Sequence, residues 1–209
     1  MNMFIVDFVF RWAHVLFGIT WIGMLYYFNF VQTEYFKEAE AGAKADAMKK
    51  LAPRALWWFR WGAMFTFLTG FILLMAARPF GNMGASALIL MGSLTGTLMF
   101  LNVWLIIWPN QKIVLGLAQG DGPVAAAKAG LASRTNTLFS GPMLFGMLGA
   151  KHAPFLTPST TGLIACAALI LALEANALFG KQGPMTKVVG VIHMSILLTG
   201  VVWALLAFL

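Results

Sequence analysis

Long apolar stretches recur along the whole chain, and they limit its fold more than any other feature. A helix needs about 20 mostly apolar residues to cross a membrane. We predict six such spans. The fourth is short, and if it is re-entrant the protein has five transmembrane helices. The predicted spans are residues 12–31, 55–77, 84–108, 137–150, 159–179 and 188–209. The sequence therefore predicts an all-α, polytopic membrane helix bundle.

The composition supports one membrane domain over residues 1–209. Of the 209 residues, 60% are hydrophobic and 10% are charged, whereas soluble domains have about 25% charged residues. Residues 37–50, KEAEAGAKADAMKK, are the main polar segment, and we expect a short amphipathic cytoplasmic helix or a solvated loop there. Cys166 is the one cysteine, so an internal disulfide, a covalently attached c-type haem and a cysteine-ligated iron–sulfur cluster are excluded.

The basic residues are divided unequally between the two ends of the predicted spans. One side holds Arg11, Arg78 and Lys151, and the other side holds the remaining eleven of the 14 Lys and Arg residues. The side richer in Lys and Arg normally faces the cytoplasm. We therefore predict a multi-pass protein of the bacterial inner membrane with both termini in the periplasm. The net charge of +7 then reflects topology and lipid contact, not binding of nucleic acid.

Three histidines are candidates for holding a metal. In the predicted topology His14 lies about one turn inside the outer membrane face, and His152 follows the outer end of the fourth span. Two imidazoles from different helices can ligate the iron of a b-type haem. We expect His14 and His152 to be these ligands of one haem, with His193 in reserve, and aromatic and small residues to line the porphyrin: Trp12, Phe17, Gly18 and Trp21. The alternative is that His14 only hydrogen-bonds a neighbouring helix.

Polar side chains gather at the opposite ends of the spans. Amides and cations there suit a flat, anionic, hydrogen-bonding substrate, and the candidate residues are Asn29, Asn102, Asn110, Gln111, Lys112 and Asn136. Ser133-Arg134-Thr135 precedes the last of these. The alternative is an ordinary interfacial belt of caps and lipid-contacting cations. We expect Asn102 to have an interhelical partner, because it lies inside a span.

Three stretches resemble one family over about residues 4–155. They are RWAHVLFGITWIGMLYYFNF, GSLTGTLMFLNVWLIIWPNQKIVLGLAQGDGP and NTLFSGPMLFGMLGAKHAP, and they resemble the N-terminal membrane domain of the membrane-bound urate oxidases (urate hydroxylases). The resemblance implies a redox-active domain that oxidises urate, with His14 and His152 at the motif histidines of the family. Family members typically join this domain to a C-terminal cytochrome c domain. This sequence contains no C-x-x-C-H and has Arg134-Thr135 where the family pattern carries a histidine.

These observations favour a membrane b-type cytochrome with oxidoreductase activity. It would take electrons from a small reduced substrate such as urate and pass them to a periplasmic cytochrome c or a partner membrane subunit. The first alternative is a non-catalytic accessory subunit of a larger respiratory or photosynthetic membrane complex. As partners we expect membrane lipid and either the other subunits of such a complex or further copies of this chain in a homo-oligomer. A transporter or channel ranks last, because Glu174 is the main acidic residue within a span and ion relays usually need more.

Overall fold

The computed structural model describes residues 3–84, 86–153 and 156–209, and within them every regular element is helical. The predicted all-α class is confirmed. In chain order the elements are α1 (Met3–Tyr26), η1 (Tyr27–Gln32), α2 (Thr33–Glu38), α3 (Ala41–Lys50), α4 (Ala52–Ala77), η2 (Pro79–Gly81), α5 (Ala87–Leu101), η3 (Asn102–Ile107), α6 (Trp108–Val114), α7 (Gly122–His152), α8 (Thr160–Phe179), η4 (Gly183–Thr186) and α9 (Val188–Phe208). Elements η1 and η3 are π-helical turns, and η2 and η4 are 3₁₀ turns.

Five helical rods in the described residues are long and apolar enough to cross a membrane. Two of these rods each contain a π-helical turn and continue through it without a break. One rod consists of α1, η1 and α2, and the other consists of α5, η3 and α6. The first and third spans are therefore longer than the sequence predicts. Residues 41–50 form the short helix α3, which was one of the two alternatives for segment 37–50.

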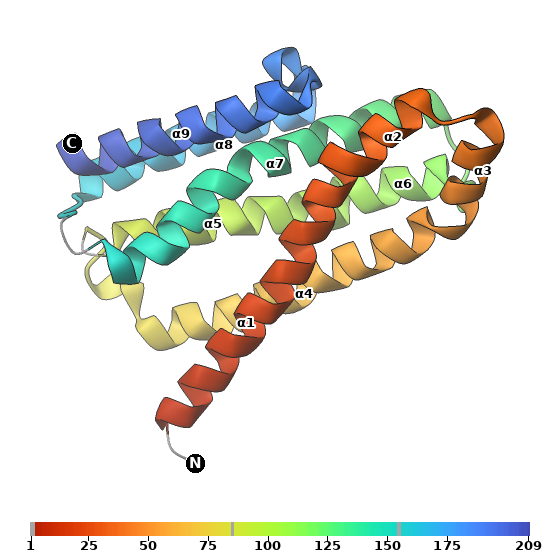
Figure 1. The fold of residues 1–209 in the computed structure, drawn as a ribbon. Coiled ribbons are helices and arrows are strands. Elements are labelled where there is room, and N and C mark those ends of the chain that lie inside the picture. Colours follow the sequence, from red (N-terminus) through yellow and green to blue (C-terminus); the bar gives the residue numbers. More distant parts are fainter. Residues whose placement is uncertain (1–2, 85, 154–155) are drawn as a thin grey trace.

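The fourth span differs most from its prediction. The sequence predicts a short segment over 137–150, with a re-entrant segment as the alternative, but α7 is one continuous helix of 31 residues that includes Pro142. Its length of about 46 Å exceeds the hydrocarbon core of a bilayer, which is about 30 Å. Helix α7 packs against α5, α6 and α9 and lies in the middle of the bundle (Figure 1). A central helix meets other helices instead of lipid, so small and polar residues can replace the apolar ones.

The helices leave the bundle at two opposite ends (Figure 1). The terminal end holds the start of α1, the end of α7 and the C-terminus of α9, as well as the connection from α4 to α5. The loop end holds α2, α3 and the connections from α6 to α7 and from α8 to α9. Because α7 runs the full length, the chain passes between the two ends six times.

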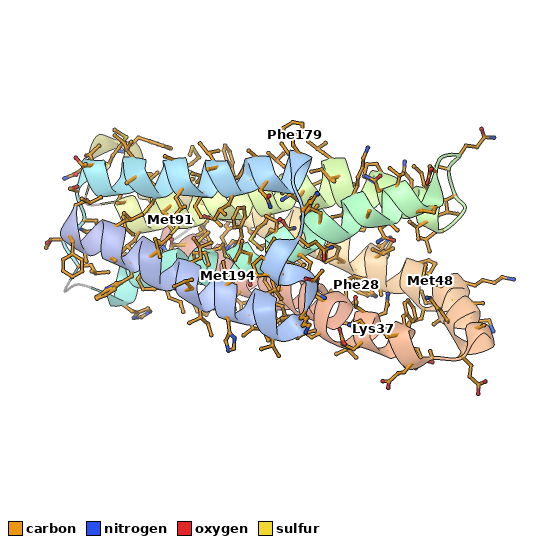
Figure 2. The ribbon with its side chains drawn as sticks, turned by 90° about the horizontal axis from the view of Figure 1, so that it is seen from above. Phe28, Lys37, Met48, Met91, Phe179 and Met194 are labelled. Atoms are coloured by element: carbon orange, nitrogen blue, oxygen red, sulfur yellow. The ribbon has the colours of Figure 1, made fainter. Side chains whose placement is uncertain are left out.

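Close contacts between small residues hold the bundle together. A Cβ added to Gly92 of α5 would lie 3.1 Å from the backbone nitrogen of Met147, and one added to Gly146 of α7 would lie 2.6 Å from the carbonyl oxygen of Leu88. Gly92 and Gly146 thus allow the backbones of α5 and α7 to approach each other closely. Figure 2 shows the buried Met91 inside the bundle and Phe179, at the end of α8, on its surface.

Candidate functional site

His14 is held by helix α4. Its Nδ1 lies 2.9 Å from the carbonyl oxygen of Thr66 and 3.2 Å from the hydroxyl oxygen of Thr69. A carbonyl oxygen can only accept, so Nδ1 carries the hydrogen and Nε2 keeps its lone pair. This is the arrangement found for metal-ligating histidines, in which a backbone carbonyl fixes the tautomer through the other ring nitrogen.

Gly70 provides the space for this imidazole. A Cβ at Gly70 would lie 2.8 Å from Cε1 of His14, which is too close for the ring to remain in this position. Three of the predicted porphyrin-lining residues follow His14 on the α4-facing side of α1: Phe17 packs on Phe65 with ring centroids 5.0 Å apart, Gly18 faces Thr66, and Trp21 is buried. Trp12 is 60% exposed.

The other two histidines lie elsewhere. His152 is exposed at the last residue of α7, at the terminal end, and His193 is exposed near the start of α9, at the loop end. Within the described ranges no hydrogen bond orients either imidazole, and none joins one of them to His14. No group of three or more His, Cys, Asp or Glu side chains in that part of the chain could hold a metal ion.

Three of the polar residues inside the spans form a buried network. The amide of Asn102 donates to Oδ1 of Asn136 at 2.9 Å and to a carboxyl oxygen of Glu174 at 3.1 Å. Asn136 in turn donates to the carbonyl oxygen of Met99 at 2.9 Å. The expected interhelical partner of Asn102 is confirmed, and the network ties α5 and η3 to α7 and α8.

A cavity of about 280 Å³ lies at the loop end of the bundle. It lies between η1, α4, α7 and the connection from α8 to α9. Its apolar walls are Phe28, Leu56, Phe59 and Ile107, and its polar lining is Asn29, Gln32, Thr33, Gln111, Ser133, Arg134, Gln182 and Thr186. Met48 of α3 also lines it, and Figure 2 shows Met48 and Phe28 at this same end of the molecule. Residues of both π-helical turns reach the cavity, and such turns are often found at functional sites.

Arg134 is the one cation among these lining residues. It is 5% exposed, and its Nη1 is buried without a hydrogen-bond partner. No ion pair to Arg134 is present in the described residues, and the nearby acidic residue Glu34 is paired with Lys37 at 2.7 Å. The Oε1 atom of Gln32 is also buried without a partner. Arg134 and Gln32 thus both line the cavity, and each has one buried polar atom without a hydrogen-bond partner, a donor in Arg134 and an acceptor in Gln32.

The predicted substrate residues are divided by the structure. Asn29 and Gln111 line the cavity, whereas Asn102 and Asn136 belong to the buried network. Asn110 donates to the carbonyl oxygen of Ile106 in its own helix, and Lys112 lies 5.9 Å from the Trp108 ring centroid. Gln32 and Gln182 were missed, because a glutamine near a helix end carries no spacing signal. Arg134 lies two residues before Asn136 in the sequence but was not among the predicted substrate residues.

The fold and these buried polar groups define a class: an integral membrane helix bundle with polar sites inside its spans. The model of the family described as "Urate oxidase N-terminal" matches residues 78–207, which is more than half of the chain, so the chain belongs to this family. The match includes Arg134, Asn102 and His152, and it begins after the first of the three resembling stretches. We find no match among curated proteins or among solved structures.

Proposed function

We propose that this protein is a membrane oxidoreductase domain of the urate oxidase type. It takes electrons from a small reduced substrate such as urate and passes them to an external acceptor, either a cytochrome c or a neighbouring redox subunit. Hydroxylation of urate consumes one water and releases two protons and two electrons, which two molecules of cytochrome c accept. Membership of the family supports the substrate class.

The observation that carries the redox part of the proposal is the geometry of His14. Its Nδ1–H donates to the carbonyl of Thr66, and its Nε2 is left with a free lone pair on a half-buried ring. Such a nitrogen would suit a ligand of haem iron if a haem binds there. A haem bound there would supply one-electron redox chemistry. Gly70 leaves room for the ring, and the Thr66 carbonyl keeps the ligating nitrogen deprotonated.

His152 is the proposed second ligand. It lies at the terminal end, as does the N-terminal half of α1 that carries His14. His193 lies near the start of α9, at the loop end, and is the reserve candidate. A haem at the terminal end would lie near the periplasmic face in the proposed orientation, where a soluble cytochrome c could approach it.

The test is the reduced-minus-oxidised visible spectrum of the purified protein, recorded for wild type, His14→Ala, His152→Ala and His193→Ala. We expect a sharp b-type α-band in wild type that is lost or shifted in the first two variants and unchanged in the third. Adding urate to the oxidised wild type should produce the reduced band. A featureless spectrum from well-folded wild type would refute the cytochrome proposal, and loss of the band in His193→Ala alone would refute the ligand pair.

A further inference from the structure

We infer that the cavity around Arg134 is a binding site for a planar organic anion that carries N–H donors beside its negative edge. Oxopurine anions such as urate have this chemistry. Binding in the cavity does not depend on a redox role, and only the choice of urate as the anion rests on the proposed function.

The first step of the argument is the unpaired charge. A buried cation is strongly unfavourable unless an anion or several acceptors accompany it. Arg134 is 5% exposed, its Nη1 has no partner, and no carboxylate of the described residues forms an ion pair with it. A guanidinium presents donors in a planar fork that matches a planar anion. A bound anion would supply the partner that Arg134 lacks.

The second step concerns acceptors, which distinguish the kinds of anion. Gln32 Oε1 is buried without a donor. The amide nitrogen of Asn29 already donates to the Leu25 carbonyl and to Ser133 Oγ, so its carbonyl oxygen is what it can offer a ligand. These oxygens need N–H or O–H groups from the ligand. Fully ionised phosphate-like anions and simple carboxylates offer acceptors only, whereas an oxopurine anion offers ring N–H groups as well as oxygens.

The third step is size and shape. The volume of about 280 Å³ is close to the lower end of ligand pockets, about 300–1,000 Å³. Phe28 and Phe59 supply apolar walls that suit the faces of a flat ring, and their own rings contact each other edge to face at 5.5 Å. The cavity lies at the loop end, where ten Lys and Arg residues besides Arg134 outnumber five acidic residues outside the spans and so favour the approach of anions.

The cavity is a separate site from His14. Asn29 follows His14 by fifteen residues on one continuous helical rod, which is about 22 Å along the axis. A variant of the cavity can therefore change anion binding without touching the proposed haem ligands, and the two proposals can fail independently.

The experiment is isothermal titration of the purified, full-length protein with urate, with neutral hypoxanthine and with inorganic sulfate, a fully ionised anion that offers acceptors only. Three proteins are compared: wild type, Arg134→Gln and Arg54→Gln. Arg54 is exposed at the start of α4, at the same end of the bundle, so its variant removes the same charge outside the cavity. We expect wild type and Arg54→Gln to bind urate equally. Arg134→Gln should bind it at least about ten-fold more weakly, the scale of one hydrogen bond to a charged group.

Hypoxanthine should bind wild type at least about ten-fold more weakly than urate, and sulfate should neither bind nor compete. Without ligand, Arg134→Gln should unfold at the same temperature as wild type or higher, because it removes an unpaired buried charge; this shows that lost binding is not lost folding. Equal urate affinity in wild type and Arg134→Gln would overturn the site and leave the redox proposal standing. Equal losses in both variants, or competition by sulfate, would also overturn it.

Discussion

At the scale of single residues, the position of the His14 imidazole depends on Gly70, which has no side chain to displace it. In Gly70→Ala the imidazole has to leave its place, because the new Cβ would lie 2.8 Å from Cε1. Loss of the hydrogen bond to Thr66 lowers the free energy of unfolding by about 1 kcal/mol. The higher helix propensity of alanine raises it by about 1 kcal/mol. We expect the free energy of unfolding to change by less than about 1 kcal/mol, while ¹⁵N NMR of histidine-labelled protein shows that His14 has lost its Nδ1–H tautomer.

Gly23 provides the matched control for this change. It is exposed on α1, and a Cβ there would meet nothing within 4 Å. Gly23→Ala should leave the ¹⁵N signals of His14 unchanged. If Gly70→Ala also leaves them unchanged, the imidazole is not held against α4 in the way described.

Asn102 is the residue on which the buried network depends. It donates to both Asn136 and Glu174, so Asn102→Leu leaves two buried acceptors without their donor. We expect a loss of about 2–4 kcal/mol in the free energy of unfolding, since each unsatisfied buried group costs about 1–3 kcal/mol. Asn110→Leu is the comparison: Asn110 bonds only a carbonyl of its own helix, and its loss should be below about 1 kcal/mol. Equal losses in reversible detergent unfolding would show that the network adds no stability.

At the scale of elements, the crossing of α5 and α7 depends on Gly146. A Cβ at Gly146 would lie 2.6 Å from the Leu88 carbonyl oxygen, which is backbone and cannot rotate away. Gly146→Ala should therefore separate the two helices and lower the free energy of unfolding by about 1–3 kcal/mol, the usual range for overpacking. A Cβ at Gly149 would meet the flexible side chain of Leu88 at 3.2 Å and, at an ordinary 3.8 Å, the Cβ of Ala153, so Gly149→Ala should cost less than about 1 kcal/mol. The reverse order of stability would contradict this packing.

The elements also show what could be predicted from the sequence. Lipid-facing helices are apolar along their length, so the spans other than α7 were predictable from apolar runs alone. Helix α7 was not, because hydropathy measures contact with lipid and α7 contacts other helices. Asn102 could be expected to have a partner because of its depth. The meeting of Arg134, Gln32 and Gln182 at one cavity depends on how three separate segments pack, and no local pattern encodes that.

The whole molecule has one strongly basic end, and its orientation in the membrane is the last expectation to test. Eleven Lys and Arg residues belong to the loop end and three to the terminal end, so the loop end should face the cytoplasm. Single cysteines can report this in a Cys166→Ser background, because Cys166 is buried. Gly42 of α3 and Thr157, before α8, are both exposed and mark the loop end and the terminal end respectively.

We expect a membrane-impermeant maleimide to label Thr157→Cys in intact spheroplasts of a bacterial host, and to label Gly42→Cys only after the membrane is opened. The physical reason is the cost of moving the cluster of cations across the membrane against the potential, about 2.3 kcal/mol per charge per 100 mV. Labelling of Gly42→Cys in intact spheroplasts would show that the topology is the reverse of the one predicted. The cavity around Arg134 would then draw its anion from the periplasm, and His14 would lie near the cytoplasmic face, out of reach of a periplasmic cytochrome c.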